Sequence, residues 1–229
     1  MVKPVVLVHG AFHGAWCWEK VTPLLDGAGV PWHALDLPSC ADASSGAGVV
    51  EDDLAVRAVL DGLPGEETAI LLGHSRGGTV ITEAGTHDRV GHLVYLTALL
   101  LEKGENPGTR IGSTLANASI RNPDGTWSAD VGPGADLFYN DCNGSDISWA
   151  ASKLRSQTVA VDTKNSVEAW KTTPSTYVVC NLDKALLPDT QRSMAQNAQH
   201  VVEWGTGHSP FLNRPELVAA LLVGLSVSS

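Results

Sequence analysis

The chain has 229 residues, of which 43% are hydrophobic and 17% are charged, so it is long enough for one sizeable core and matches the size of a single large α/β domain. Its 15 Lys and Arg residues against 25 Asp and Glu residues give a net charge of −10. This charge argues against nucleic acid or anionic lipid as a partner, because their phosphates would be repelled overall, and it favours a small molecule.

The four cysteines are scattered and form no C-x-x-C pair, which indicates neither a zinc site nor a disulfide framework. We expect reduced, mostly buried thiols. Residues 1–4 lead directly into an apolar segment without the features of a signal peptide, and no apolar stretch approaches the roughly 20 residues that span a bilayer. These features predict a cytoplasmic protein without a membrane partner.

Short, β-branched apolar runs alternate along the chain with longer helix-like segments. Because the runs are apolar on both faces, they predict parallel strands that are buried under helices on both sides. The expected strands are Val5 to Val8, Trp32 to Leu35, Thr68 to Leu72, Leu93 to Leu96, Thr176 to Cys180 and Val201 to Trp204. The expected helices are Trp18 to Ala28, Val49 to Leu60, Thr79 to Gly85, Asp189 to Ala198 and Pro215 to Leu225. This alternation predicts an open α/β sheet of about six strands.

Residues 101–173 interrupt the alternation. They contain no clean strand run and are rich in Gly, Asn, Asp and Ser, with several aromatic residues among them. A long insertion that carries aromatic residues in need of burial is more often a functional lid than a disordered loop. We interpret the segment as a small, mainly helical cap; a set of irregular surface loops is the alternative.

The stretch "GHSRGG" places Ser75 between an apolar strand and a predicted helix, in the pattern G-x-S-x-G. In such a strand-turn-helix elbow a strained backbone raises the serine hydroxyl above the sheet, and the flanking glycines avoid collisions. This context favours a nucleophile over a serine that merely caps the helix.

A serine hydroxyl needs a histidine base and a carboxylate that orients it. His208 follows the last predicted strand at its carboxyl end, whereas His200 precedes that strand, so His208 is the predicted base. Asp183 lies three residues beyond the preceding strand and is the stronger candidate for the carboxylate. Asp189 follows a proline and is typical of a helix start.

An oxyanion needs hydrogen-bond donors, and the usual pair is the amide after the nucleophile and an amide after an early strand. Those positions here are Arg76 and Ala11. For the Arg76 side chain we weigh two roles: an ion pair with an acidic residue beneath the cap, or a place at the acid-product side of the pocket.

His9 and His13 are four residues apart but have no acidic third ligand, so we expect no metal.

Four stretches together resemble the α/β-hydrolase superfamily: "VVLVHGAFHGAWCWEKVTPLL", "LLGHSRGG", "YVVCNLDKALLPDTQRSMA" and "GTGHSPFLNRPELVAALL". More narrowly they resemble the branch of plant methylesterases, hydroxynitrile lyases and related bacterial carboxylesterases, including pyrethroid-hydrolase-like enzymes. Within the cap, "LFYNDC" followed by "WAASKLRSQ" is similar to the bacterial esterases. The resemblance implies a Ser75, Asp183 and His208 triad with the Ala11 and Arg76 amides as the oxyanion hole. The similar lyases carry a threonine and a lysine where this chain has Gly10 and Ser209, which favours hydrolysis.

We therefore expect a serine carboxylic-ester hydrolase without cofactor that acts on a small to medium, apolar or aromatic ester. The expected substrate-binding side chains are Phe12, Trp127, Phe138, Trp149 and Phe211, any of which can instead be plain core. An amidase or lactonase, a lyase on the same scaffold and a non-catalytic small-molecule receptor remain as alternatives. The resemblance is compatible with a monomer or a homodimer.

Overall fold

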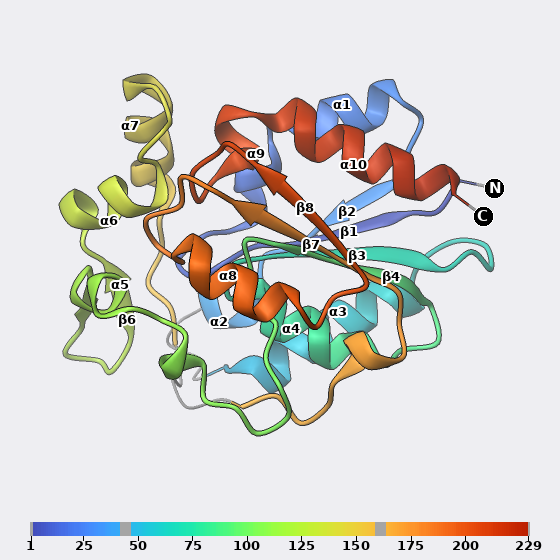
Figure 1. Cartoon of the computed structure of the whole chain (residues 1–229), viewed down its shortest axis with the longest axis horizontal. Coiled ribbons are helices and arrows are strands. Elements are labelled where there is room, and N and C mark those ends of the chain that lie inside the picture. The colour runs from blue at the N-terminus through green and yellow to red at the C-terminus, as the bar shows by residue number, and fades with distance from the viewer. Residues whose placement is uncertain (1, 42–46, 159–163, 229) are drawn as a thin grey trace.

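A computed structural model describes residues 2–41, 47–158 and 164–228 (Figure 1). In this part of the chain one sheet of six strands runs through the centre of the molecule in the order β2-β1-β3-β4-β7-β8, and every neighbouring pair is parallel. The strands are β1 (Val5–Val8), β2 (Trp32–Ala34), β3 (Ala69–His74), β4 (Val90–Leu96), β7 (Ser175–Cys180) and β8 (His200–Trp204). The predicted α/β sheet of about six strands is confirmed.

Helices cover both faces of the sheet (Figure 1). The longer ones are α1 (Thr22–Gly27), α3 (Val49–Asp61), α4 (Gly77–Ala84), α8 (Pro188–Ala195) and α10 (Pro215–Val227). Short helical turns join them: η1 (Ala15–Trp18), α2 (Pro38–Ala41), η3 (Pro107–Thr109), η4 (Ala169–Lys171) and α9 (Pro210–Asn213). Of the helix expected over Trp18 to Ala28, only Thr22–Gly27 is helical, as α1, while Trp18 is the last residue of η1. Pro23 lies in the first turn of α1, a position that proline favours.

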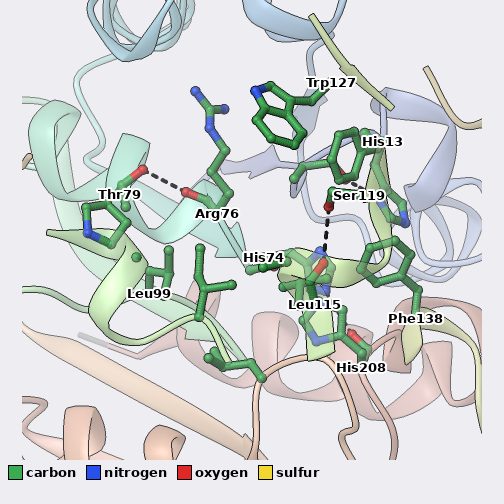
Figure 2. A pocket seen from close by; sticks show the side chains of 18 of the residues that line it. His13, His74, Arg76, Thr79, Leu99, Leu115, Ser119, Trp127, Phe138 and His208 are labelled. Carbon is green, nitrogen blue, oxygen red and sulfur yellow. Dashed lines mark hydrogen bonds between the residues drawn. The ribbon is translucent and has the colours of Figure 1, made fainter. Parts of the chain in front are cut away.

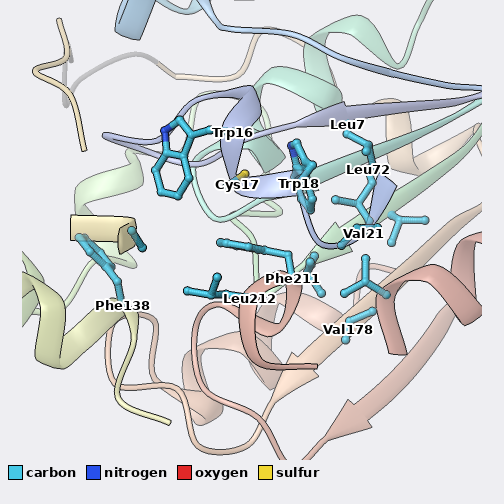
Figure 3. Close-up of a cluster of buried hydrophobic side chains, with 14 of the residues drawn as sticks. Leu7, Trp16, Cys17, Trp18, Val21, Leu72, Phe138, Val178, Phe211 and Leu212 are labelled. Atoms are coloured by element: carbon cyan, nitrogen blue, oxygen red, sulfur yellow. The ribbon is translucent and has the colours of Figure 1, made fainter. Parts of the chain in front are cut away.

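Alternate residues of the strands feed two cores, as expected for a sheet that is buried on both sides. On one face, Leu7, Leu72 and Val178 pack with Trp18 and Phe211 (Figure 3). On the other face, side chains of α3, α4 and α8 pack against the intervening strand residues, including Val8, Leu71, Tyr95, Tyr177 and Val179. The rigid sheet holds the ends of β1, β3, β7 and β8 in fixed relative positions.

The predicted cap falls in the segment between β4 and β7, which lies beside the carboxyl ends of the strands (Figure 1). It contains α5 (Ser113–Asn117), α6 (Val131–Phe138), α7 (Gly144–Lys153) and an antiparallel pair, β5 (Ser119–Arg121) with β6 (Trp127–Ala129). This hairpin has no clear sequence signature, because its strands have only three residues each and carry no apolar alternation. Part of the predicted cap, residues 159–163, lies outside the described residues.

The cap packs on the core. Leu137, Phe138, Tyr139 and Ala150 belong to the same buried cluster as the strand residues of one sheet face. The described residues include no helix of the length and apolarity that a membrane span requires.

Candidate active site

Ser75 lies in a sharp turn between β3 and α4 and has a φ of +52°, a left-handed conformation that is costly for a residue with a side chain. The turn is held by hydrogen bonds from the Ser75 amide to the Leu96 carbonyl (3.2 Å) and from the Leu99 amide to the Ser75 carbonyl (3.0 Å). A Cβ at Gly73 would lie 2.6 Å from the Gly77 carbonyl oxygen. The flanking glycine is therefore required by close approach of the backbone, as the elbow motif predicts.

His208 and Asp183 meet in the interior, at the ends of β8 and β7. The Nδ1 atom of His208 lies 2.7 Å from Oδ2 of Asp183, and the side chains are 1% and 0% exposed. Because a carboxylate can only accept, Nδ1 carries a hydrogen, so in the neutral imidazole the lone pair is on Nε2. His208 and Ser75 line the same cavity, so the structure brings the three predicted residues to one place.

The Asp183 carboxylate has further partners that the sequence motifs do not indicate. Its Oδ1 accepts from the amides of Ala185 (2.7 Å) and Leu186 (2.9 Å). Its Oδ2 accepts from the Thr97 hydroxyl and from Nε2 of Gln191 (3.0 Å). Thr97 directly follows an expected strand, and this position could have identified it as a residue near the site. Nothing in the sequence distinguishes Gln191 in this way. These donors fix the orientation of the carboxylate toward His208.

The backbone amides of Ala11 and Arg76 belong to residues that line the cavity beside Ser75. Within the described part of the chain, neither amide has a protein acceptor. Phe12, next to Ala11, has a φ of +64° and is held from the cap: its amide donates to Oε1 of Gln157 (3.0 Å), and its carbonyl accepts from the Arg155 amide (2.8 Å). Two unpaired amides beside the serine are suited to a developing negative charge.

The Arg76 guanidinium forms a buried ion pair with Asp52 of α3, with Nη2 2.7 Å from Oδ2. The same carboxylate accepts from the Ser39 hydroxyl (2.7 Å) and amide (2.9 Å), and Nε2 of Gln157 donates to the Ser39 hydroxyl (3.1 Å). Of the two roles weighed for this side chain, the structure shows the ion pair with an acidic residue. The positive charge is therefore balanced at the cavity wall.

Three buried histidines surround these residues. Burial disfavours the imidazolium form and lowers the pKa of His9 to about 4, that of His13 to about 3 and that of His74 well below its ordinary value. His9 accepts from the Leu37 amide (3.0 Å), and His74 Nε2 donates to the His208 carbonyl (2.8 Å). Among the described residues, no cluster of three His, Cys, Asp or Glu side chains has the arrangement of a metal site.

A cavity of about 400 Å³ lies between the loops that carry Ser75 and His208 and the predicted cap (Figure 2). Polar atoms are few in its wall, which is mostly apolar: Phe12, Val49, Leu99, Pro107, Ile111, Leu115, Trp127, Phe138 and Leu186. Of the expected substrate-binding residues, Phe12, Trp127 and Phe138 lie in this wall. Trp149 and Phe211 do not.

Trp149 and Phe211 have packing positions instead of the expected places at the cavity wall. The Trp149 ring packs edge-on against Trp16 at 5.3 Å between ring centroids. Phe211 is fully buried and lies between Trp18 (5.3 Å) and His74 (4.9 Å). Both side chains pack against neighbouring aromatic rings. The residue type alone does not distinguish such a packing role from contact with a ligand.

Residues 5–221 match the model of the alpha/beta hydrolase family, and the chain belongs to this family. It is 30% identical to a pyrethroid hydrolase of Sphingobium wenxiniae over 95% of this chain and 85% of that protein. It is 27% identical to methylesterase 2 of Arabidopsis thaliana over 96% and 95% of the two chains. The crystal structure of a pyrethroid hydrolase from Sphingobium faniae superimposes with a TM-score of 0.86 at 27% identity, over 99% and 98% of the chains.

These comparisons confirm the branch that the sequence motifs indicated, with plant methylesterases and bacterial pyrethroid hydrolases as relatives. The methylesterase and the pyrethroid hydrolase are named as carboxylic-ester hydrolases. The expected enzyme class, a carboxylesterase-type α/β hydrolase, is therefore confirmed.

Proposed function

We propose that the protein is a serine carboxylesterase with Ser75 as nucleophile, His208 as base and Asp183 as the carboxylate that orients His208. The proposal rests on the buried hydrogen bond of 2.7 Å between His208 and Asp183, because His208 and Ser75 line the same cavity. This bond leaves Nε2 of His208 free to take a proton from the serine hydroxyl.

In the first half-reaction the Ser75 oxygen attacks the ester carbonyl while His208 removes the hydroxyl proton. The carbonyl oxygen becomes an oxyanion, which the Ala11 and Arg76 amides stabilise. Collapse of this intermediate breaks the bond to the alcohol oxygen, and His208 returns its proton to the departing alcohol. Water, which loses a proton to His208, then attacks the carbonyl carbon of the acyl-serine; the bond from this carbon to the Ser75 oxygen breaks, and His208 returns the proton to that oxygen as the acid is released.

The proposed substrate is a neutral ester of small to medium size with an apolar or aromatic part. The cavity of about 400 Å³ is walled mainly by aliphatic and aromatic side chains, among them Trp127 and Phe138. Arg76 adds no net charge to that wall, because Asp52 neutralises it. Esterase names among the relatives support the same reaction class.

A cyanohydrin lyase is disfavoured by the shape of the site. A Cβ at Gly10 would lie 2.8 Å from Nδ1 of His74 and 2.9 Å from Cβ of Ser75, so a threonine at this position requires those side chains to move. Ser209 also lacks the positive charge that would stabilise a cyanide leaving group. An amidase or a lactonase uses the same groups as an esterase, and a receptor uses the cavity without turnover.

A substrate panel separates these alternatives. Esters, amides, lactones and cyanohydrins are assayed with the wild type and with a folded Ser75→Ala variant. We expect ester hydrolysis by the wild type alone, with esters turned over faster than the matched amides. Ester turnover no faster with the wild type than with Ser75→Ala would refute the proposal.

A further inference from the structure

The cap residues Tyr139, Asn140 and Asp141 follow α6 and belong to the "LFYNDC" motif, for which the proposed mechanism has no use. Each contacts a different loop of the catalytic centre, and their neighbour Phe138 lies at the cavity wall beside His208, with 5.8 Å between ring centroids. Three consecutive residues thus reach the loops of the proposed oxyanion hole, carboxylate and base.

Tyr139 contacts the loop of the proposed oxyanion hole through His13. Nδ1 of His13 lies 2.7 Å from the Ala11 carbonyl oxygen, which can only accept, so Nδ1 carries the hydrogen. The Tyr139 hydroxyl lies 2.9 Å from Nε2 of His13 and therefore donates to it. The side chains of Tyr139 and His13 are buried, and this chain of two hydrogen bonds connects the cap to the residue that supplies one of the proposed oxyanion donors.

Asn140 contacts the turn before Asp183. Its Nδ2 donates to the carbonyl oxygen of Leu182 at 3.0 Å. The Leu182 amide in turn donates to the Thr206 carbonyl (2.9 Å), two residues before His208. The turns that carry the carboxylate and the base are therefore connected to each other and to the cap.

Asp141 contacts the turn that carries His208. Its Oδ2 accepts from the amide of Gly207 and from Nδ2 of Asn213 (2.6 Å), which ends α9. The approach is close: a Cβ at Gly207 would lie 2.5 Å from Oδ1 of Asp141 and 2.6 Å from Oδ1 of Asn140. Because the bond acts on the residue directly before His208, we expect a change at Asp141 to shift the imidazole relative to Asp183 and to the cavity that Ser75 also lines.

The geometry points to Asp141 as a positioning residue for His208, and to the segment 139–141 as the element that fixes the three catalytic loops relative to one another. This inference rests on the proposed function, since it assigns a role relative to the triad. It gives the cap a part in catalysis besides covering the cavity. The partner atoms, one on each loop, are the observation that supports it.

The test compares Asp141→Ala and Asp141→Asn with the wild type, using a chromogenic ester. Asp141→Ala removes both acceptor contacts and is expected to lower kcat by about 10- to 100-fold with KM changed less than about threefold. Asp141→Asn keeps an oxygen that accepts from Gly207 and Asn213, so it is expected to stay within about threefold of the wild type. The control is Asp136→Ala, an exposed carboxylate on α6 of the same cap, for which we expect wild-type kinetics.

Wild-type kcat in a folded Asp141→Ala variant, or an Asp141→Asn variant as slow as Asp141→Ala, overturns the inference. If Asp141→Ala does not fold, Gly207→Ala takes its place: its Cβ pushes against Asp141, and we expect the same loss of kcat, with an unchanged kcat again overturning the inference. A wild type that hydrolyses no ester refutes the proposed function itself, so the two failures are distinguishable.

Discussion

Asp183 and His208 are joined by a hydrogen bond of 2.7 Å between two buried side chains, whereas the carboxylate of Asp189, six residues after Asp183, is 98% exposed and paired with Arg192. We therefore expect Asp183→Asn to lower kcat on a chromogenic ester by about 10³- to 10⁴-fold, because an amide no longer holds the imidazole in the required tautomer. Asp189→Asn is the matched control and is expected to retain wild-type kcat. The opposite pattern in the two variants would transfer the role to Asp189.

The buried ion pair of Arg76 and Asp52 predicts a large effect on stability. Asp52→Leu leaves a guanidinium without its partner and is expected to lower the free energy of unfolding by about 3–5 kcal/mol, measured by urea denaturation. The double variant with Arg76→Leu is expected to lose less, because no unpaired charge remains. The control Asp53→Leu, from the more exposed pair with Arg57 on the same helix, is expected to cost no more than about 1 kcal/mol. Equal losses for Asp52→Leu and Asp53→Leu would contradict this account.

The different positions of Trp127 and Trp149 predict different effects on substrate preference. Trp127 lines the cavity, so Trp127→Ala is expected to raise kcat/KM for a bulky aryl ester relative to the corresponding acetate by about tenfold. Trp149 packs on Trp16 outside the wall, and Trp149→Ala is expected to leave this ratio within about twofold. The ratios are measured with both esters on each variant. A change for Trp149→Ala without one for Trp127→Ala would show that the binding site lies elsewhere.

The buried histidines predict that stability falls in mild acid. Burial lowers the pKa of His9 from its ordinary 6.5 to about 4 and that of His13 to about 3, so below pH 6.5 the unfolded chain binds protons that the folded protein does not. The free energy of unfolding should therefore decrease as the pH falls from 6.5 toward 4, by about 1.4 kcal/mol per pH unit for each such histidine.

Urea denaturation at several pH values between 4 and 7 checks this dependence. We expect His9→Gln to have a shallower slope by about one proton, and His33→Gln, which changes an exposed histidine, to have the wild-type slope. A His9→Gln slope equal to that of the wild type would refute the assignment.

The sequence predicted the sheet well because each parallel strand is buried on both faces and therefore appears as a continuous apolar run, as in β1 and β7. Ser75, Asp183 and His208 were predicted as site residues from the order in which they follow such strands, and the structure brings them together. The partners Thr97, Gln191 and Gln157 depend on contacts between distant segments and have no local signal, apart from the position of Thr97 after β4. The cap was the least predictable element, since its three-residue strands and polar turns are stabilised by tertiary contacts.

The proposed mechanism requires that Ser75 forms an acyl intermediate. The most direct measurement is mass spectrometry of the protein quenched during turnover of a slow ester, with peptide mapping of the adduct. We predict an acyl group on the peptide that contains Ser75 in the wild type, no adduct in Ser75→Ala, and a loss of kcat of at least about 10³-fold in that variant. Ester turnover by Ser75→Ala at the wild-type rate, or an adduct on another residue in the wild type, would contradict the account.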